Sequence, residues 1–513
     1  MRFSYGLTAS PRIPLGTREE RTMPEQILLQ GKILGTEDFL LAGVSGVPSG
    51  SGEGRPVRSA GEDLLAGRSQ WITLLSEVLP RALLAELGLA RVMLGSSGGG
   101  QFLVVLSGDK LEAAESFLKA AAHQISDLSS GMVRLVWGVT DNLGDWSVIR
   151  KRLNEQLDAR RDAPLAAVAS GLFQPYLPAA NPEADAYFAK ELGARVREAA
   201  HIGWSPENPG KVIPGAGKHA WTITPNLSPD GIMLARHAAP TDDGKSAAPV
   251  QTLARRSQGR SIWGVLRGDV DNFGLRLRRV HSIEEHVPLS VLYKQFFAGE
   301  LEVVCSLPEF WKKVSIIYCG GDDFAVYGSW DALIALAREV QRLFHRFTEE
   351  NLKDYPGPEG KTITMAIALA PETYYPLAAI YEEAGRNLHL AKAADKDCIY
   401  LLGRVLEWRH LNDAAELKDT VTRLIHEFRM SRQFLYQLRS FYRREAYADG
   451  AETQHAWRFQ RRFNRILSGT RGREFQKLRT HLIGEMAGRR SAEVKLRPAG
   501  LVALEWARLV TES

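Results

Sequence analysis

Paired carboxylates stand at the ends of two predicted strands in the second half of the chain. Residues 267–274 read RGDVDNFG, with Asp269 and Asp271 at the end of an apolar run. Residues 312–327 read KKVSIIYCGGDDFAVY, which predicts a hairpin with Gly-Gly-Asp-Asp at its tip. Strand ends that lie side by side hold carboxylates at one edge of a sheet, where hard cations bridge them to a triphosphate. The two segments therefore predict a two-metal nucleotide site.

The hairpin tip carries two glycines whose properties fit the same chemistry. Because they lack a Cβ, Gly320 and Gly321 can take positive φ and let a phosphate or an adenine approach the backbone closely. A solvated turn is the simpler interpretation, since Gly and Asp are ordinary turn residues. The second acidic strand end at Asp269 and the alternating residues 324–327 favour the nucleotide site over the solvated turn.

The composition describes a large protein with several domains. The chain has 513 residues, 44% of them hydrophobic, which is enough for about three or four domains with buried cores. Basic residues concentrate toward the C-terminus, which indicates a polyanionic partner although the formal net charge is only +5. The three cysteines have no CxxC spacing, so the sequence supports neither a disulfide framework nor a thiolate zinc site. With no apolar run of membrane-spanning length and no apolar signal core, we expect a cytoplasmic protein without membrane contact.

The first half of the chain repeats the pattern of the second half. Strand, helix, glycine hairpin and helix follow one another over 261–352, and the same order is predicted earlier in the chain. We place the first strand of the earlier copy at 38–47, its helix at 64–84 and its hairpin around Gly98 and Gly99. The repeat predicts two domains of the same fold.

The earlier copy lacks the acidic residues of the later one. In this placement Gly43 and Ser45 stand where Asp269 and Asp271 stand, and Gln101 follows the glycines. Without carboxylates at either strand end, this copy is expected to bind a nucleotide but to hold no metal ions.

These elements predict an α+β fold with two ferredoxin-like palm domains, an α-rich insert between them and a C-terminal helical bundle. Arginines alternate with aromatic residues over 432–479, which indicates a bundle with aromatics in its core and arginines on its solvated face. Direct RNA contact by that basic face stays open, because arginines also neutralise phosphates and rings stack on bases. The expected domains are a leader (1–35), a first palm domain (36–159), an inter-palm linker domain without zinc cysteines (160–260), a second palm domain (261–410) and a basic C-terminal helical domain (411–513).

Several motifs carry a resemblance to a known family. The second copy contains RGDVDNFG, CGGDDFAVYG, YEEAGRNLHLAKAADKD and CIYLLGRVLEW, the first contains GVSGV, LAGRSQWITLL and SSGGGQFLVVL, and RPAGLVALEWARLV stands near the end. In this order, from about residue 36 onward, the chain resembles the large palm-polymerase subunit of type III CRISPR effector complexes, the cyclic oligoadenylate synthetase, in a form like that of subtype III-A. The GGDD motif alone would also fit diguanylate cyclases.

The resemblance implies a role for each site residue. Asp269, Asp322 and Asp323 would be catalytic and would bind two Mg²⁺ or Mn²⁺ ions, with ATP as the substrate. The other implied nucleotide or metal contacts are the Val270 carbonyl, the backbone amides of 271–274 with Asn272, Phe273 and Gly274, the turn glycines Gly320 and Gly321, Lys392 at the phosphates, and Ser45, Gly98 and Gly99 around the acceptor ATP. A solvated helix lysine is the alternative interpretation of Lys392.

The function that the resemblance implies is target-RNA-activated synthesis of cyclic oligoadenylates from ATP. The partners implied are the other subunits of the effector complex, the CRISPR guide RNA and the target RNA. The alternative is a non-catalytic or weakly active scaffold that anchors guide RNA and partner subunits, and the three intact aspartates favour the enzyme. A stand-alone dinucleotide cyclase that uses GTP is a third hypothesis, against which the duplicated palm within one chain argues.

Two features of the family pattern are missing from the sequence. The chain holds no His-Asp dipeptide and starts almost directly at the first copy. We therefore expect a form that lacks the N-terminal HD nuclease domain and has no HD-type DNase activity. Paired CxxC motifs of a zinc knuckle are also missing between the palms, so we expect the insert to be held by packing.

Overall fold

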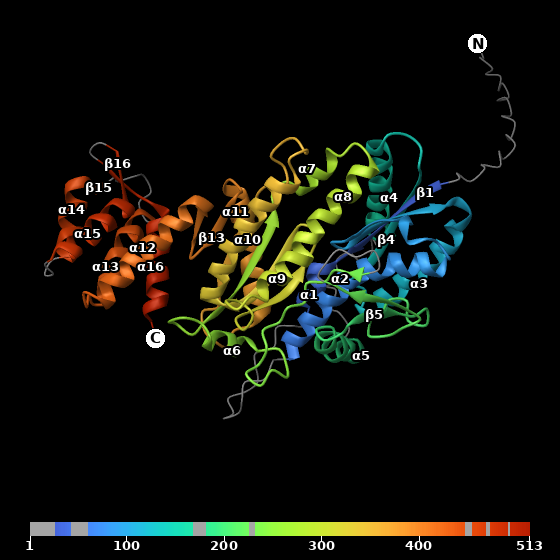
Figure 1. The fold of residues 1–513 in the computed structure, drawn as a ribbon, viewed down its shortest axis with the longest axis horizontal. Helices are drawn as coiled ribbons and strands as arrows, with labels where there is room; N and C mark the ends of the chain where they lie inside the picture. Colours follow the sequence, from blue (N-terminus) through green and yellow to red (C-terminus); the bar gives the residue numbers. More distant parts are fainter. Residues whose placement is uncertain are drawn as a thin grey trace, which may run out of the picture.

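The computed structural model describes residues 26–42, 60–167, 181–224, 231–446, 454–467, 472–490 and 493–512. In Figure 1 the elements of the first half of the chain lie at one end of the long axis, the second palm lies in the middle, and the C-terminal helices lie at the other end. None of the helices in these ranges is long and apolar enough to cross a membrane.

The first palm is a sheet of order β2-β3-β1-β4 with β1 (Gln26–Leu34) near its centre. Side chains of β1 alternate between the two faces. Leu29 packs in the core with α2 and α3, whereas Leu28 packs on the opposite face with residues of α4. The other elements are α1 (Thr36–Leu41), α2 (Ala60–Glu86), β2 (Leu94–Gly98), β3 (Gln101–Ser107), α3 (Leu111–Leu128), β4 (Arg134–Asp141) and α4 (Trp146–Ala167).

The second palm is built in the same way on a longer sheet, β10-β11-β9-β12-β13-β14. Leu266 of β9 packs in the core with α8 and α10, and Val265 packs on the other face with α11. The elements are β9 (Trp263–Val270), α7 (Phe273–Arg278), α8 (Ile283–Lys294), the π-helical turn η4 (Gln295–Glu300), α9 (Leu301–Cys305), β10 (Val314–Cys319), β11 (Asp323–Ser329), α10 (Trp330–Asn351), β12 (Ile363–Leu369), α11 (Leu377–Ala394), β13 (Cys398–Leu401) and β14 (Arg404–Glu407).

The two palms share their topology, which confirms the predicted repeat. The order β10-β11-β9-β12 repeats β2-β3-β1-β4, and both hairpins carry an irregularity in the strand before the turn. In each domain a short helix follows the central strand. The residue before that helix has a left-handed backbone in both copies, Gly35 with φ 77° and Asn272 with φ 57°.

The predicted strand at 38–47 is wrong. Thr36–Leu41 is the helix α1, and 43–47 lie outside the described residues. The strand of this copy is β1, so the expected leader 1–35 is also wrong for Gln26–Leu34. The apolar run Phe-Leu-Leu at 39–41 resembles a strand, but its buried residues Phe39 and Leu40 are neighbours rather than alternating residues, as in one turn of a helix.

The described part of the insert packs on α2 of the first palm. Phe188 of the π-helical turn η3 (Tyr187–Gly193) contacts Trp71 and Phe39, with ring centroids 5.1 Å and 5.5 Å away. The insert also holds a four-stranded sheet, β6-β5-β7-β8, of which the sequence indicated only the strand near 221–223. The elements are α5 (Pro182–Ala186), β5 (His201–Trp204), β6 (Ile213–Pro214), β7 (His219–Ile223), β8 (Gly231–Ile232) and α6 (Val250–Arg255).

The C-terminal region is a helical bundle with a small sheet of order β15-β17-β16. Five of its aromatic side chains are buried and form the predicted core, whereas Tyr436 is exposed: the buried ones are Phe434, Phe441, Tyr442, Phe463 and Phe475. The elements are α12 (Trp408–His426), α13 (Gln433–Ala446), β15 (Gln454–His455), α14 (Ala456–Ile466), α15 (Arg473–Met486), β16 (Ala487–Arg490), β17 (Glu493–Leu496) and α16 (Pro498–Thr511).

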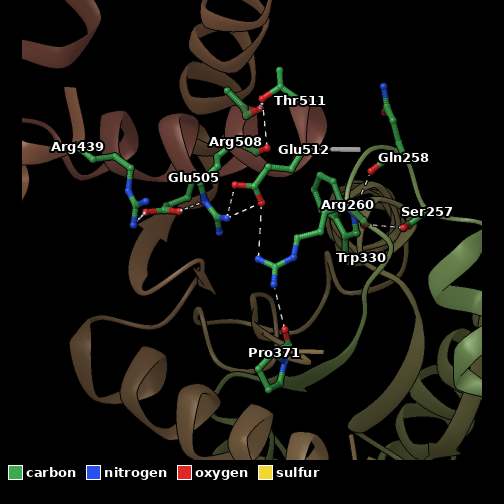
Figure 2. A network of polar contacts seen from close by, with 11 residues as sticks. Ser257, Gln258, Arg260, Trp330, Pro371, Arg439, Glu505, Arg508, Thr511 and Glu512 are labelled. Atoms are coloured by element: carbon green, nitrogen blue, oxygen red, sulfur yellow. Dashed lines mark hydrogen bonds and ion pairs between the residues drawn. The ribbon is translucent and has the colours of Figure 1, made fainter. Parts of the chain in front are cut away.

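The end of α16 is attached to the second palm through Arg260, which precedes β9 (Figure 2). The Arg260 amide donates a hydrogen bond to the Leu509 carbonyl at 2.8 Å. Its guanidinium donates to the Pro371 carbonyl at 3.1 Å and lies 3.7 Å from a carboxylate oxygen of Glu512. Trp330 Nε1 donates to the Arg260 carbonyl at 3.1 Å. The C-terminal bundle is therefore fixed at the start of the central strand of the second palm.

Glycines on the two central strands make room for aromatic rings of the neighbouring strands. A Cβ added at Gly31 would overlap the Phe102 ring, and one added at Gly268 would overlap the Phe324 ring. The two pairs are equivalent, because Gly31 is the cross-strand neighbour of Phe102 and Gly268 that of Phe324.

We expect Gly31→Ala to lower the free energy of unfolding by about 1–3 kcal/mol, because the added methyl group displaces a packed ring. Phe102→Leu in the same protein should recover part of the loss, and urea-induced unfolding measures both. Gly484→Ala in α15 is the matched control, since an added Cβ there meets nothing within 4 Å. Its stability should stay equal or rise by about 1 kcal/mol. Equal stability of the two alanine variants would contradict the packing argument.

Candidate active site

The second palm brings the two acidic strand ends together. Asp269 at the end of β9 and Asp323 at the start of β11 are cross-strand neighbours in the antiparallel register. The Val270 amide donates a hydrogen bond to the Asp322 carbonyl at 2.9 Å, which fixes the hairpin tip against the end of β9. Three carboxylates therefore meet at one edge of the sheet.

Two side chains hold the facing carboxylates in place. The Lys392 ammonium, from α11, contacts Asp269 Oδ1, and the Tyr318 hydroxyl donates a hydrogen bond to Asp323 Oδ2. Gly320 leaves room for this arrangement, because a Cβ at that position would overlap Asp323 Oδ1. Any residue other than glycine would therefore move the Asp323 carboxylate.

Burial and mutual repulsion raise the pKa values of these carboxyl groups. Burial raises the pKa of Asp322 to about 7, and repulsion from Asp323 and Asp269 adds to the effect. The pKa of Asp323 rises to about 6, through burial and repulsion from Asp269. Burial also raises the pKa of Asp269, although Lys392 opposes it. Among the described residues Lys392 is in direct contact with Asp269 and lowers the pKa of Asp322 and Asp323 only through its charge, so the described site has more negative charge than it neutralises.

Asp271, the second carboxylate of the strand end, points away from this site. It is 2% exposed, and its oxygens accept hydrogen bonds from the hydroxyls of Thr362 (2.8 Å) and Thr364 (2.7 Å) and from the Asp397 amide (3.0 Å). Its own amide donates to the Thr362 carbonyl at 2.9 Å. The expectation that the Asp271 amide binds phosphate is therefore wrong, because that N–H is already used. Asp271 fixes β9 to the loop before β12.

The residues that follow Asp271 differ in what surrounds them. The Asn272 side chain accepts a hydrogen bond from Lys396 at 2.6 Å. The Phe273 ring packs edge-on against Tyr293, with centroids 4.7 Å apart. Gly274 has no atom within 4 Å of the position of an added Cβ, so its backbone is open to a ligand.

The glycine turns of the two palms touch each other, and a cavity lies on each side of the contact. A Cβ added at Gly99 would stand 3.0 Å from the Gly321 amide nitrogen. The second-palm cavity, about 210 Å³, is lined by Arg267, Tyr318, Asp323 and Tyr381 of the second palm and by Thr36, Glu37, Ser69, Thr73 and Gly99 of the first. The first-palm cavity, about 340 Å³, is lined by Gln30, Ser97, Gly98, Gln101 and Arg150 of the first palm and by Phe273, Gly274, Arg278, Lys294 and Asp322 of the second.

The two cavities are built alike. Each has one wall from the central strand and hairpin of one palm and another wall from the short helix of the other palm, α1 in one case and α7 in the other. In the second-palm cavity Arg267 links the two domains. Its guanidinium lies 4.4 Å from the ring centroid of Tyr381 in the second palm and 3.2 Å from Glu37 Oε1 in the first. Asp323 faces the second-palm cavity and Asp322 faces the first-palm cavity.

The strand register gives the true counterpart of Asp269 in the first palm. Lys32 is the cross-strand neighbour of Gln101, as Asp269 is of Asp323. The Ile33 amide donates to the Gly100 carbonyl at 2.8 Å, which repeats the hydrogen bond from the Val270 amide to Asp322. The segment Gln-Gly-Lys-Ile at 30–33 therefore corresponds to Arg-Gly-Asp-Val at 267–270.

The predicted correspondence of Gly43 and Ser45 to Asp269 and Asp271 is wrong. Both residues follow β1 and α1 in the chain, and both lie outside the described residues. Sequence reasoning missed Lys32 because this basic residue stands where the second palm has the acidic Asp269. The signal that could have found it is the glycine one position earlier, which follows a long polar residue in both copies, Gln30 in one and Arg267 in the other.

A buried ion pair supports the hairpin of the first palm. Glu77 of α2 lies 2.6 Å from Lys294 of α8, and its other oxygen lies 2.8 Å from Arg81. The Ser97 hydroxyl donates to the same carboxylate at 2.9 Å. Burial opposes the charge on Glu77, but Lys294 and Arg81 with their hydrogen bonds lower its pKa overall. This pair links the two palms beneath the turn that contains Gly98.

Within the described residues, no three His, Cys, Asp or Glu side chains are gathered closely enough to hold a metal ion as they stand. The three aspartates are the nearest approach to such a group, and Lys392 and Tyr318 contact two of them. Their oxygen donors and unbalanced negative charge fit hard divalent cations.

A family model describes the centre of this site. The model of the second palm domain of Cas10/Cmr2 matches residues 262–400, which include Asp269, the GGDD hairpin and Lys392. Curated relatives are CRISPR system single-strand-specific deoxyribonucleases Cas10/Csm1 of subtype III-A. That of Enterococcus italicus is 28% identical over 207 residues, 38% of this chain and 25% of the relative. That of Mycobacterium tuberculosis is 27% identical over 193 residues, 31% of this chain and 23% of the relative.

The matched segments span about a quarter of the length of these relatives. Solved structures match more of the chain. The apo Csm1-Csm4 cassette has a TM-score of 0.71 at 18% identity, covering 97% of this chain and 72% of that chain. The cassette in complex with cA3 has a TM-score of 0.66 at 17% identity, covering 97% and 71%. The cassette in complex with one ATP has a TM-score of 0.66 at 18% identity, covering 96% and 70%.

At these identities the structural likeness concerns the fold, and it agrees with the predicted class of two palms with helical parts. The family model and the sequence relatives indicate which family the chain resembles. The resemblance to the large subunit of type III CRISPR complexes is thereby confirmed, and residues 262–400 match the model of the Cas10/Cmr2 second palm domain.

Proposed function

We propose that this chain synthesises cyclic oligoadenylates from ATP, as the large subunit of a type III CRISPR complex that target RNA activates. The observation that carries the proposal is the pairing of Asp269 with Asp323 at the wall of a cavity that the other palm completes. Two similar cavities side by side give room for a donor and an acceptor nucleotide. Csm1-Csm4 cassettes of the same fold bind ATP and cA3, which supports these ligands.

Asp269, Asp322 and Asp323 are the residues that would hold two Mg²⁺ or Mn²⁺ ions, with the Val270 carbonyl as a further oxygen donor. When bound, such ions lower the pKa of a ribose hydroxyl and stabilise charge on the pyrophosphate leaving group. The repulsion among the three carboxylates, which raises their pKa values, would be relieved by a bound cation. Lys392, now in contact with Asp269, would then have its ammonium available to a phosphate.

The chain itself orients the two nucleotides. Gly320, Gly321, Gly98 and Gly99 let phosphates or bases approach the two turns without a side chain between them. Gly274 and its neighbours Asn272 and Phe273 line or adjoin the first-palm cavity, where they would contact the acceptor ATP. The roles of Lys392 and these residues remain predictions, and so does that of Ser45.

The scaffold alternative keeps the same fold without the reaction. A scaffold has no use for three buried carboxylates that repel one another, because their ionisation costs stability. The raised pKa values of Asp322 and Asp323 therefore favour the enzyme. In either case we propose that the chain assembles with other effector subunits, CRISPR guide RNA and target RNA.

We expect the complex, assembled with matching target RNA and given labelled ATP with Mg²⁺ or Mn²⁺, to form cyclic oligoadenylates. Asp322→Ala/Asp323→Ala should lower the rate at least about 100-fold, because it removes charge-stabilising groups at the reaction centre. Asp413→Ala in α12 is the matched control and should keep the wild-type rate. This aspartate pairs with His410 of the same helix and is not part of the proposed site. No product with any nucleotide or target would favour the scaffold.

A second expectation concerns DNA. The sequence holds no His-Asp dipeptide, so the purified chain with target RNA and Mn²⁺ should leave single-stranded DNA intact. Electrophoresis of a labelled oligonucleotide measures this. Robust cutting that survives Asp322→Ala/Asp323→Ala would show a nuclease centre that the described residues do not explain.

A third expectation follows from the raised pKa values of Asp322 and Asp323, about 7 and about 6. The folded protein binds these protons more tightly than the unfolded chain, so stability falls as pH rises from about 4 through about 7. Each unit of pKa shift corresponds to about 1.4 kcal/mol. In EDTA, Asp322→Asn/Asp323→Asn should therefore melt above wild type at about pH 8 and close to it at about pH 4.5.

The same melting experiment tests metal binding. Mn²⁺ should raise the melting temperature of wild type at about pH 8 and leave that of Asp322→Asn/Asp323→Asn unchanged. A difference between the two proteins that is equal at both pH values, or a Mn²⁺ response that the double variant retains, would contradict the charge argument.

A further inference from the structure

A third cavity adjoins the first-palm cavity. It has a volume of about 430 Å³ and is lined by residues of α2, η1 (Arg91–Met93), β2, α8 and the insert. It shares Ser96, Ser97, Ser290 and Lys294 with the first-palm cavity but no lining residue with the second-palm cavity. The first-palm cavity therefore lies between the reaction centre at Asp323 and this outer cavity.

The lining of the outer cavity has the composition of a phosphate site. Its charged side chains are all basic: Arg81 of α2, Arg91 of η1 and Lys294 of α8. The three shared serines add hydroxyl groups beside them. Carboxylates line both of the other cavities, whereas none lines the outer cavity. Guanidinium, ammonium and hydroxyl groups without a carboxylate suit phosphate oxygens rather than metal ions.

The three cations lie close enough to repel one another. Burial lowers the pKa of Lys294, and its contact with Glu77 opposes this change. Repulsion from Arg81 and Arg91 lowers the Lys294 pKa further. Glu77 contacts both Lys294 and Arg81, so one carboxylate faces two cations before Arg91 is counted. The Arg81 and Arg91 guanidiniums both donate to the Gly231 carbonyl at 3.5 Å, which is long for a hydrogen bond. An anion in the cavity would relieve the repulsion and supply closer acceptors.

The proposed reaction forms an anionic product that is longer than ATP. In each addition the ribose hydroxyl oxygen of the acceptor bonds to the α-phosphorus of ATP, and pyrophosphate leaves with the electron pair of the broken P–O bond. The hydroxyl proton is released. The first product is therefore a linear diadenylate that keeps the 5′-triphosphate of the acceptor.

A second addition requires the new ribose hydroxyl of the diadenylate to take the acceptor position in the first-palm cavity. The 5′-terminal nucleotide must then move out of that cavity, away from Asp323, and the outer cavity adjoins it on that side. We propose that the outer cavity binds the 5′-triphosphate of the linear oligoadenylate. The inference rests on the proposed function for the identity of this ligand.

Binding at this position favours extension of the chain. Ring closure requires the terminal ribose hydroxyl to bond to the α-phosphorus of the 5′-triphosphate, with loss of the hydroxyl proton and departure of pyrophosphate. The 5′ end must therefore leave the outer cavity and return to the reaction centre first. Arg81, Arg91 and Lys294 thus retain the intermediate between additions, and weaker binding there should release more linear diadenylate.

The test is equilibrium binding of two synthetic linear diadenylates to the purified full-length chain, one with a 5′-triphosphate and one with a 5′-hydroxyl. EDTA is present, so that no metal supports a reaction. Wild type should bind the triphosphate form at least about 10-fold more tightly, and Arg91→Met should weaken that binding by about 10- to 100-fold, the value of one charge-assisted hydrogen bond. Binding of the hydroxyl form should stay unchanged. Arg91→Lys keeps the charge and should recover part of the affinity.

A second variant adds a negative charge and leaves the ion pair of Glu77 intact. Val287 of α8 lines the outer cavity, so Val287→Glu should weaken binding of the triphosphate form selectively, whereas the neutral Val287→Gln should weaken it much less. Arg346→Met in α10, where the arginine is exposed and lies 4.0 Å from Glu350, is the matched control and should bind both ligands as wild type. Unchanged melting temperatures separate lost binding from lost folding.

Equal affinity of wild type for the two diadenylates would overturn the inference, and so would an equal loss of both ligands in Arg91→Met and Val287→Glu. Inorganic pyrophosphate is the third ligand. A site for free pyrophosphate would show weaker pyrophosphate binding in Arg91→Met without any preference of wild type for the triphosphate form, which would also overturn the inference.

The proposed function is judged separately by product formation in the assembled complex. Cyclic product without a preference for the triphosphate form would refute the inference and keep the proposed function. A complex that makes no oligoadenylate, while Arg91→Met selectively loses the triphosphate form, would refute the proposed function and keep the binding site. Where both hold, the Arg91→Met complex should release a larger share of linear diadenylate than wild type.

Discussion

The contact between the glycine turns of the two palms is the constraint on which the rest of the site depends. Gly99 approaches the Gly321 amide so closely that an added Cβ would stand 3.0 Å from its nitrogen. At that distance neither turn tolerates a large side chain. The contact sets the distance between the two central strands. It therefore also sets the distance between Asp269, at the end of one strand, and Lys32, at the end of the other. The buried pair of Glu77 and Lys294 holds one turn from below, and the hydrogen bond from the Val270 amide holds the other.

Duplication followed by charge reversal explains why one fold offers two unlike surfaces. The backbone of the central strand, the glycine beneath the ring and the left-handed residue before the short helix are common to both palms. These features depend on packing and backbone geometry, which constrain residue size more than charge. Asp269 and Lys32 at the strand end are only partly buried, so the same fold accommodates either charge at this position. The charge of the side chain therefore differs between the two palms at a position where packing does not restrict it.

Much of the fold and part of the site could be predicted from the sequence. The GGDD turn and the alternation of β9 and β11 are local signals, and they correctly brought Asp269 next to Asp323. The role of Asp271 could not be predicted, because its partners Thr362 and Thr364 come from a strand as far as 93 residues away. The first strand was misplaced because Gln30 and Lys32 interrupt its apolar pattern, whereas residues 39–41 of α1, Phe-Leu-Leu, are an uninterrupted apolar run. The insert sheet was missed because strands of two to five residues carry too little alternation to be recognised.

The shared wall between the cavities has a thermodynamic consequence. Thr73, Gly99, Cys319 and Gly320 line both cavities. A ligand that shifts these residues in one cavity changes the shape of the other, and the resulting coupling energy is the same in both directions. If the nucleotide in the second palm strengthens binding in the first by some factor, the nucleotide in the first palm must strengthen binding in the second by that same factor. Two palms that each bind a nucleotide, as proposed, would thus form one cooperative binding unit, whose occupancy would respond to ATP concentration more or less steeply than that of two separate sites.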